Sequence, residues 1–206
     1  MAWNHPEWEL VLFTDESSFS GCWDQKRQVW WPVRCRYKAP YIQMIAASGR
    51  SSVQVRSAIS SSGLGPLHRM EGSFTASKYV EILREVLLPH VLDGPFPDGF
   101  FWLQLYRSPV YCAQKVQDFL EESAIRQLPW PPGGADMNVI ENVWGLLKRT
   151  LVKRNLQDSS KETLWATLSE EWEKLRLDDQ LPAVLFQSLP RRMRDVISSQ
   201  GGSIKY

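Results

Sequence analysis

Two acidic side chains in the sequence are candidate ligands for a metal ion. Asp15 follows the apolar run Leu10–Phe13, and Glu141 lies in the segment 138–144 (NVIENVW). Carboxylate oxygens are the ligands that hard divalent cations require, and two such cations about 3.5 to 4 Å apart catalyse phosphoryl transfer. The pair therefore indicates a candidate two-metal site for chemistry on phosphate esters.

Both carboxylates also have a purely structural interpretation. Asp15 could end a strand in an Asp/Ser turn, where the side chain accepts hydrogen bonds from the following backbone. Glu141 could form a capping box with Asn138 at the start of a helix. The residue types alone leave these alternatives open.

The elements that position the two carboxylates follow an α/β pattern. Continuous or alternating apolar runs predict strands at 8–14, 28–31, 53–59, 67–71, 100–106 and 125–128. Apolar residues at helical spacing predict helices from Thr75 to Pro89, at 113–122, from Asn138 onwards, at 162–175 and at 181–198. Strands first, then alternating strands and helices, then helices alone predict a mixed sheet flanked by helices, with helices at the C-terminus.

This arrangement predicts a site at one edge of the sheet. Asp15 ends the first buried strand and Tyr106 ends the second, and ligand sites in α/β folds form at the carboxyl ends of strands. The segment 129–134 is too rich in proline and glycine for a helix or a central strand, so it forms a loop. Glu141 enters one turn into the helix that follows, and we expect it to meet Asp15 and Tyr106.

Composition indicates one globular domain over residues 1–206, because 43% hydrophobic residues suffice for a core. With 24 basic and 23 acidic residues, the chain lacks the strongly basic balance of many nucleic-acid-binding proteins, so any basic surface is local. The candidates for phosphate contact are Lys148, Arg149, Lys153, Arg154, Arg191, Arg192 and Arg194. Ordinary solvated helix faces explain these residues at least as well.

The cysteines Cys22, Cys35 and Cys112 form no CxxC pair and are odd in number, so we expect no disulfide framework and a reducing compartment. The three histidines do not follow a zinc-binding spacing. No apolar run approaches the roughly 18 to 20 residues that cross a bilayer, and no secretory signal opens the sequence. An intracellular chain without membrane spans is the expectation.

At its motifs the sequence resembles the catalytic domain of the Tc1/mariner transposases. Residues 14–19 (TDESSF) resemble the first-aspartate motif of that family, and 129–148 (PWPPGGADMNVIENVWGLLK) are similar to its third-carboxylate motif. Shorter likenesses to the middle section and the C-terminus occur at 63–67, 76–83, 188–192 and 201–206. The resemblance covers nearly the whole chain in order. It implies a ribonuclease-H-like DDE domain for Mg²⁺-dependent DNA cleavage, strand transfer and DNA integration, with Asp15 and Glu141 holding metal.

The position of the second catalytic aspartate departs from the family pattern. Where the family has Gln-Asp-Asn-Ala-Pro, residues 104–109 of this chain read QLYRSP. When the two prolines are aligned, Tyr106 replaces the second carboxylate. A phenol, with a reference pKa of about 10, is neutral at pH 7 and gives a metal no formal negative charge. Asp98 and Asp118 lie too far along the chain to substitute.

The neighbours of these residues add two expectations. Glu16 should point away from Asp15, because successive side chains of a strand alternate between its faces. Arg107, next to Tyr106, is expected to lie beside the carboxylates and to neutralise Asp15 or Glu141.

The expected protein is a transposase-derived domain without strand-transfer activity that binds Mg²⁺ weakly or not at all. It would keep weak, sequence-independent DNA binding or bind a protein partner, and a homodimer is an option. The alternatives are a weak Mg²⁺- or Mn²⁺-dependent endonuclease and a relic without a selected role. Because the first expected strand starts soon after Met1, we expect the amino-terminal helix-turn-helix half of the family to be missing. The expected location is the nucleus rather than the cytoplasm.

Overall fold

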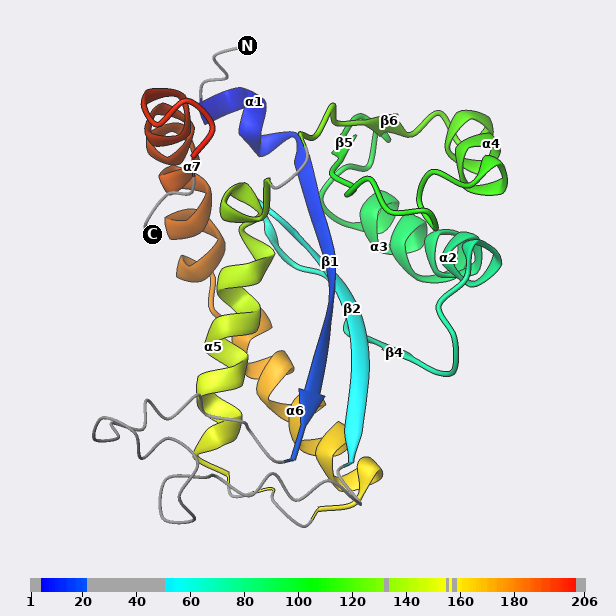
Figure 1. Ribbon diagram of the computed structural model, residues 1–206, viewed down its shortest axis with the longest axis vertical. Helices are drawn as coiled ribbons and strands as arrows, with labels where there is room; N and C mark the ends of the chain where they lie inside the picture. The colour runs from blue at the N-terminus through cyan, green and yellow to red at the C-terminus, as the bar shows by residue number, and fades with distance from the viewer. Residues whose placement is uncertain (1–4, 22–50, 132–133, 155, 157–158, 203–206) are drawn as a thin grey trace, which may run out of the picture.

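The computed structural model describes residues 5–21, 51–131, 134–154, 156 and 159–202, with a mixed sheet at its centre (Figure 1). The strands are β1 (Val11–Ser20), β2 (Ser52–Ser60), β3 (Gly63–Leu64), β4 (His68–Met70), β5 (Trp102–Leu103) and β6 (Arg126–Gln127). Their order in the sheet is β3-β2-β1-β5-β6, and β4 also pairs with β2. β1 is antiparallel to β2 and parallel to β5, so the sheet is mixed as the sequence predicts. The expected strand at 28–31 lies outside the described residues.

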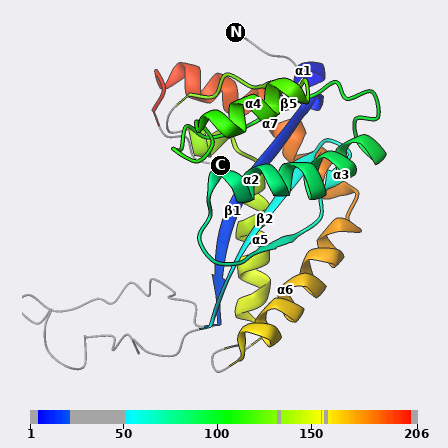
Figure 2. The same cartoon turned by 90° about the vertical axis from the view of Figure 1, so that its right-hand side faces the viewer.

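Helices cover both faces of this sheet. They are α1 (His5–Glu9), α2 (Ala76–Ile82), α3 (Leu88–Asp93), α4 (Gln114–Glu122), α5 (Ile140–Val152), α6 (Lys161–Arg176) and α7 (Gln180–Ser198). A π-helical turn, η2 (Leu83–Leu87), joins α2 to α3, and a 3-10 turn, η3 (Gly134–Met137), precedes α5. Figure 1 shows α5 and α7 on one side of β1 and β2, α6 passing behind these strands, and α2, α3 and α4 on the other side. The apolar faces of α5, α6 and α7 share one core cluster. The turned view shows α5 and α6 running along these two strands (Figure 2).

The alternation of side chains along β1 divides the core into two clusters. Phe13 and Phe19 pack into the cluster that contains the apolar faces of α5, α6 and α7. Leu12 packs into the second cluster, with residues of α2 and α4. Asp15 shares the parity of Phe13 and Glu16 that of Leu12, so the two neighbouring carboxylates face opposite sides of the sheet.

The first strand extends beyond its predicted end. β1 continues to Ser20 because it pairs with β2 from Phe13 onwards, whereas only Val11 and Leu12 pair with β5. Asp15 therefore lies within a strand and not at its carboxyl end, which corrects the expectation from the sequence.

The second buried strand is shorter than predicted. β5 has two residues, and the backbone N–H of Gln104 still donates to the carbonyl of Leu12 at 3.0 Å. No residue after Gln104 in the predicted strand 100–106 pairs with β1. Tyr106 therefore lies in the segment that follows β5 and not in the strand itself.

The predicted helix from Thr75 begins as expected and ends later. The Thr75 hydroxyl accepts from the backbone N–H of Lys78 at 3.3 Å, which caps α2. The helical path continues past Pro89 to Asp93. The π-helical turn ends before α3 begins, so Pro89 lies in the first turn of α3, where its missing backbone N–H costs little. The remaining predicted helices agree with α4, α5, α6 and α7. No helix in the described ranges combines the length and apolarity needed to cross a membrane.

Candidate functional site

The structure brings Asp15 and Glu141 together. Glu141 lies in the first turn of α5, whose residues Ile140, Val143 and Trp144 pack in the same core cluster as Phe13 of β1. This packing places Glu141 on the face of β1 from which Asp15 projects. The two side chains share a hydrogen bond, and Asp15 is only 8% exposed. The convergence expected from the sequence is thus present.

Burial is the largest influence on the pKa of Asp15. The pKa of Asp15 is raised to about 8, first by burial and then by the hydrogen bond with Glu141 and its charge. The positive charges of Arg56 and Lys148 act in the opposite direction. The backbone N–H of Glu16 also donates to Asp15 Oδ1 at 2.8 Å. At neutral pH the pair consequently retains a proton.

Tyr106 is held beside this pair by Asn138. The side-chain amide of Asn138 donates to the Tyr106 hydroxyl at 3.0 Å and to the Thr14 carbonyl at 3.4 Å. Asn138 Oδ1 accepts from the backbone N–H of Ile140 at 3.4 Å, so the residue also contributes to the start of α5. Asn138 is fully buried and connects the segment after β5, β1 and α5. Tyr106 therefore lies near the carboxylates as a hydrogen-bonded phenol.

These donors do not fit a tightly bound Mg²⁺. The ion prefers an octahedral set of oxygen ligands that includes carboxylates, and the site offers two carboxylates that bond to each other. Across the described ranges, no group of three or more His, Cys, Asp or Glu side chains could hold a metal ion. Two positive side chains, Arg56 and Lys148, already act on Asp15. We therefore derive no metal-dependent step for this chain.

The expected role of Arg107 is wrong. Its side chain is exposed and has no hydrogen bond or ion pair to any residue that the structure describes. The positive charges that act on Asp15 come from Arg56 and Lys148 instead. The chain has left the sheet before Arg107, so strand geometry no longer directs this side chain towards the carboxylates.

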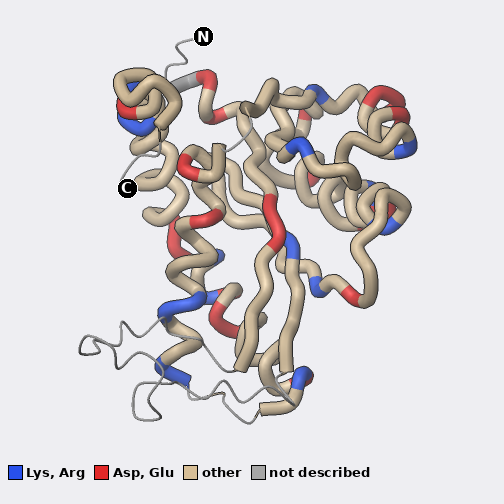
Figure 3. The backbone as a smooth tube through the Cα atoms, viewed as in Figure 1, with Lys and Arg blue, Asp and Glu red and all other residues tan. Residues whose placement is uncertain are grey.

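A buried cluster around Arg56 lies on the opposite face of β1. Arg56 of β2 is directly opposite Glu16 in the strand register, is only 3% exposed and forms an ion pair with Glu16. Its guanidinium donates to the hydroxyls of Tyr111 at 2.8 Å, Thr14 at 2.9 Å and Tyr79 at 3.3 Å. In Figure 3 the acidic stretch of β1 lies beside the basic residue of β2. We call these five residues the Arg56 cluster.

Aromatic contacts complete the Arg56 cluster. The guanidinium carbon lies 4.5 Å from the centre of the Tyr79 ring and 5.3 Å from that of Tyr111. The Tyr111 hydroxyl also donates to Glu16. Burial raises the pKa of each tyrosine to about 12, although the Arg56 charge lowers both. Glu16 thus points away from Asp15 as predicted, whereas no motif in the sequence indicated this role for Arg56.

Two of the predicted phosphate contacts bond to groups of the protein. Arg192 is 3% exposed and donates to Ser188 Oγ, the Asp136 carbonyl and Asn142 Oδ1 at 2.8, 3.1 and 2.9 Å. Arg154 forms ion pairs with Glu170 and Glu171 of α6. The burial of Arg192 argues against its assignment to nucleic acid, whereas Arg154 pairs with two glutamates and stays exposed, so its assignment stays a prediction.

The other basic candidates occupy several surroundings. Lys148 acts on Asp15, and its Nζ lies 5.7 Å from the centre of the Phe19 ring. Arg191 is exposed and lies 3.6 Å from Asp195. The candidates that are exposed and have no ion pair among the described residues are Arg149, Lys153 and Arg194.

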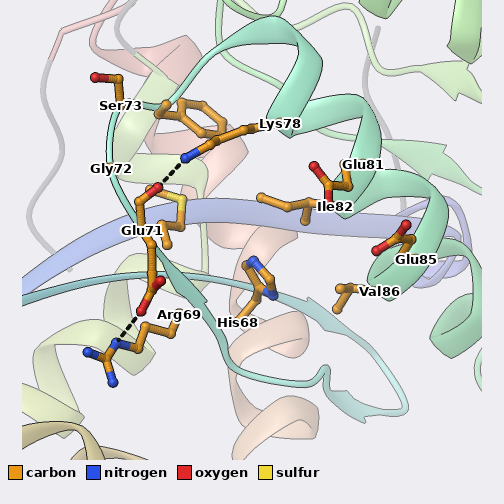
Figure 4. A pocket seen from close by; sticks show the side chains of 12 residues that line it. His68, Arg69, Glu71, Gly72, Ser73, Lys78, Glu81, Ile82, Glu85 and Val86 are labelled. Carbon is orange, nitrogen blue, oxygen red and sulfur yellow. Dashed lines mark hydrogen bonds and ion pairs between the residues drawn. The ribbon is translucent and has the colours of Figure 1, made fainter. Parts of the chain in front are cut away.

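A separate cavity of about 270 Å³ lies between β4 and α2 (Figure 4). Two contacts join its polar groups, since Lys78 Nζ donates to the Glu71 carbonyl and Arg69 Nε lies 3.5 Å from the Glu71 carboxylate. Burial lowers the pKa of His68 in its wall. None of its lining residues belongs to the carboxylate pair or to the Arg56 cluster, so it is not part of the candidate site.

Comparisons with known proteins agree with this arrangement. A family model described as DDE superfamily endonuclease matches residues 10–164. The transposable element Tcb1 transposase of Caenorhabditis briggsae is 27% identical over 209 residues, which span 100% of this chain and 74% of that protein. The transposable element Tc1 transposase of Caenorhabditis elegans is 27% identical over 208 residues, with the same coverage of both chains.

Solved structures confirm the ribonuclease-H-like fold. The catalytic domain of Mos1 mariner transposase superposes with a TM-score of 0.71 at 15% identity, over 96% of this chain and 85% of that one. A pre-cleavage Mos1 transpososome gives a TM-score of 0.73 at 15% identity, over 97% of this chain and 58% of that one. With the sequence motifs and the relatives, these likenesses show that the chain belongs to the DDE superfamily endonucleases and is homologous to the Tc1/mariner transposases.

Proposed function

We propose that this protein is a transposase-derived DNA-binding domain that has lost the metal-dependent strand chemistry of its family. The observation that carries the proposal is the set of side chains at the site. Asp15 and Glu141 bond to each other, and the phenol that stands for the second aspartate bonds to Asn138. Two carboxylates and a neutral phenol give two divalent cations too little negative charge.

The competing function is a weak Mg²⁺- or Mn²⁺-dependent endonuclease. It is favoured by one observation, the convergence of Asp15 and Glu141 on one face of β1. In this alternative both carboxylates would have to lose their shared hydrogen bond and face a cation. Arg56 and Lys148 oppose cation binding here, because their positive charges already act on Asp15.

A nicking assay on supercoiled DNA separates the two functions. The unaltered chain is expected to leave the DNA uncut with either cation, and Tyr106→Asp is expected to gain Mn²⁺-dependent nicking by restoring a third carboxylate. Changes to groups that only orient metal ligands cost about 10- to 100-fold, so adding Glu141→Ala to Tyr106→Asp should remove at least that much of the gained activity. Nicking by the unaltered chain that disappears in Glu141→Ala would overturn the proposal.

DNA binding in this proposal is weak and independent of sequence. Its phosphate contacts come from Arg149, Lys153 and Arg194, with Arg191 as a further exposed cation. A Mos1 structure that shares the fold is a paired-end complex with the left transposon end, which supports a DNA-facing role and a paired assembly for this chain. A nuclear location is part of this proposal, because the role requires access to DNA.

The ionic strength dependence of duplex binding tests the phosphate contacts. Replacing Arg149, Lys153 and Arg194 together by glutamine should make the salt slope of log affinity shallower by about 0.9 for each phosphate that is no longer neutralised. Arg154→Gln is the matched control, because Arg154 already pairs with Glu170 and Glu171 and should leave the slope unchanged. Fluorescence anisotropy at several salt concentrations gives the slope. An unchanged slope in the triple variant contradicts the assignment.

A further inference from the structure

A second cavity, of about 530 Å³, opens beside Tyr106. Its wall is formed by the segment that follows β5, by α4 and by the residues at and after β6. The volume lies within the range of about 300 to 1,000 Å³ that is typical of ligand pockets. Because Tyr106 also bonds to Asn138, the cavity adjoins the site of the carboxylate pair.

The charge of the lining favours an anion. Of the described residues that line this cavity, Arg107 is the one that carries a charge, and none is Asp or Glu. The Arg107 side chain is exposed and makes no hydrogen bond or ion pair within the described ranges. A guanidinium without an internal acceptor is suited to a phosphate, which it can bind through two N–H groups.

Aromatic rings line the same cavity. Tyr106 is partly buried and Trp130 is 7% exposed, and both contribute to the wall. Aromatic side chains bind nucleic-acid bases by stacking, and this works only for a base whose face is not covered by its neighbours in a duplex. The partly buried Tyr106 ring therefore fits an unstacked base rather than a base pair, and the buried Trp130 closes the wall beside it.

Two side-chain amides in the wall are held in fixed positions. Gln127 Nε2 donates to Gln117 Oε1 at 2.7 Å, and Gln117 Nε2 donates to the Tyr111 carbonyl at 2.7 Å. Tyr111 is itself fixed by Arg56, so this chain of bonds starts from the buried cluster. An anchored amide can bond to the polar edge of a base. The cavity thus combines a guanidinium that can bind phosphate, an aromatic wall, and amide groups that can bond to the edge of a base.

We propose that this cavity binds one unpaired nucleotide, with its phosphate on Arg107, its base against Tyr106 and Trp130, and the base edge at Gln127. The proposal rests on the proposed DNA-binding function and names the form of DNA that reaches the site. A free mononucleotide has the same chemistry as a nucleotide in a single strand, and the experiment distinguishes these two sources.

Cys112 supplies a native reporter, because its exposed thiol lines the cavity. The full chain is treated briefly with iodoacetamide, and mass spectrometry measures alkylation of Cys112 against Cys22 and Cys35 as internal references. A 12-nucleotide oligo-dT is expected to slow the alkylation of Cys112 at least threefold, and a blunt duplex of equal length is expected to have no effect. Protection by dTMP alone as strong as that by the oligonucleotide would assign the cavity to a free nucleotide.

Variants connect this protection to the proposed contacts. Arg107→Gln should abolish the protection of Cys112 and make the salt slope of oligo-dT binding shallower by about 0.7, the value for one phosphate contact with a single strand. Tyr106→Leu should weaken oligo-dT binding about fivefold or more, because leucine offers no ring on which a base can stack. Lys161→Gln, at an exposed residue outside the proposed DNA contacts, is the control for removal of a surface charge and should keep the protection.

The outcomes separate this inference from the function on which it rests. If oligo-dT binds but leaves Cys112 equally reactive, or if the duplex protects it equally well, the nucleotide site is refuted while DNA binding stands. Full protection in Arg107→Gln refutes the assigned phosphate contact. If neither form of DNA binds at low salt, the proposed function itself fails.

Discussion

Replacing Arg56 with methionine should lower the free energy of unfolding by about 3 to 5 kcal/mol, the cost of breaking a buried ion pair. The substitution removes the positively charged partner of Glu16 and the donor to the hydroxyls of Thr14, Tyr79 and Tyr111. Methionine retains much of the length and apolar volume of the arginine stem, so the destabilisation comes mainly from unpaired polar groups. Urea denaturation followed by circular dichroism measures the change.

Two companion variants identify the cause of this destabilisation. Arg191→Met removes an exposed arginine whose ion pair with Asp195 spans 3.6 Å, and it should change stability by less than about 1 kcal/mol. Glu16→Leu combined with Arg56→Met should be more stable than Arg56→Met alone, because it leaves no carboxylate without its partner. If Arg56→Met unfolds at the same urea concentration as the unaltered protein, the cluster does not stabilise the fold.

Replacing Asp15 with asparagine should stabilise the protein increasingly as the pH rises from about 4 to about 8. The carboxyl of Asp15 has an ordinary pKa of 3.8 and a pKa of about 8 in the folded chain. Between these values the unfolded chain ionises Asp15 while the folded chain keeps it protonated, so ionisation favours unfolding. Asparagine does not titrate and escapes this penalty, which grows by up to about 1.4 kcal/mol for each pH unit.

The measurement compares urea unfolding of Asp15→Asn and the unaltered protein at pH 4, 6 and 8. The difference in free energy of unfolding should be small at pH 4, larger at pH 6 and largest at pH 8. Asp93→Asn removes an exposed carboxylate and is the control. Parallel pH profiles for Asp15→Asn and the unaltered protein would show that burial does not hold a proton on Asp15.

The two faces of β1 show how one strand serves two sites. Asp15 and Glu16 are adjacent in sequence, yet one bonds to Glu141 of α5 and the other pairs with Arg56 of β2. Each of these two sides of β1 is connected to a residue in the wall of the proposed nucleotide cavity. Tyr106 connects to the carboxylate side through Asn138, and Gln117 connects to the Arg56 cluster through the carbonyl of Tyr111. The proposed cavity lies where these two networks come close.

Some corrections follow from signals that the sequence did contain. Arg192 comes three residues after Leu189 and seven after Leu185, so it lies on the apolar stripe of α7 and is buried with it. Helical periodicity that included basic residues would have placed it inside. Arg154 is different, because its acceptors Glu170 and Glu171 belong to another helix and no local pattern shows which helices pack together.

The sequence alone determined the α/β pattern, the positions of most strands and helices, and the opposite directions of Asp15 and Glu16, because these follow from local periodicity. It also indicated the family, which the comparisons confirm, and it predicts a replacement at Tyr106, because motifs are contiguous in the chain. Only the tertiary structure decided that Arg56 meets Glu16, that Arg107 turns to solvent, and that Asp15 shares a proton-bearing contact with Glu141. These outcomes depend on strand register, helix packing and burial, which arise from contacts between residues 40 to 126 positions apart and are not written in any local segment.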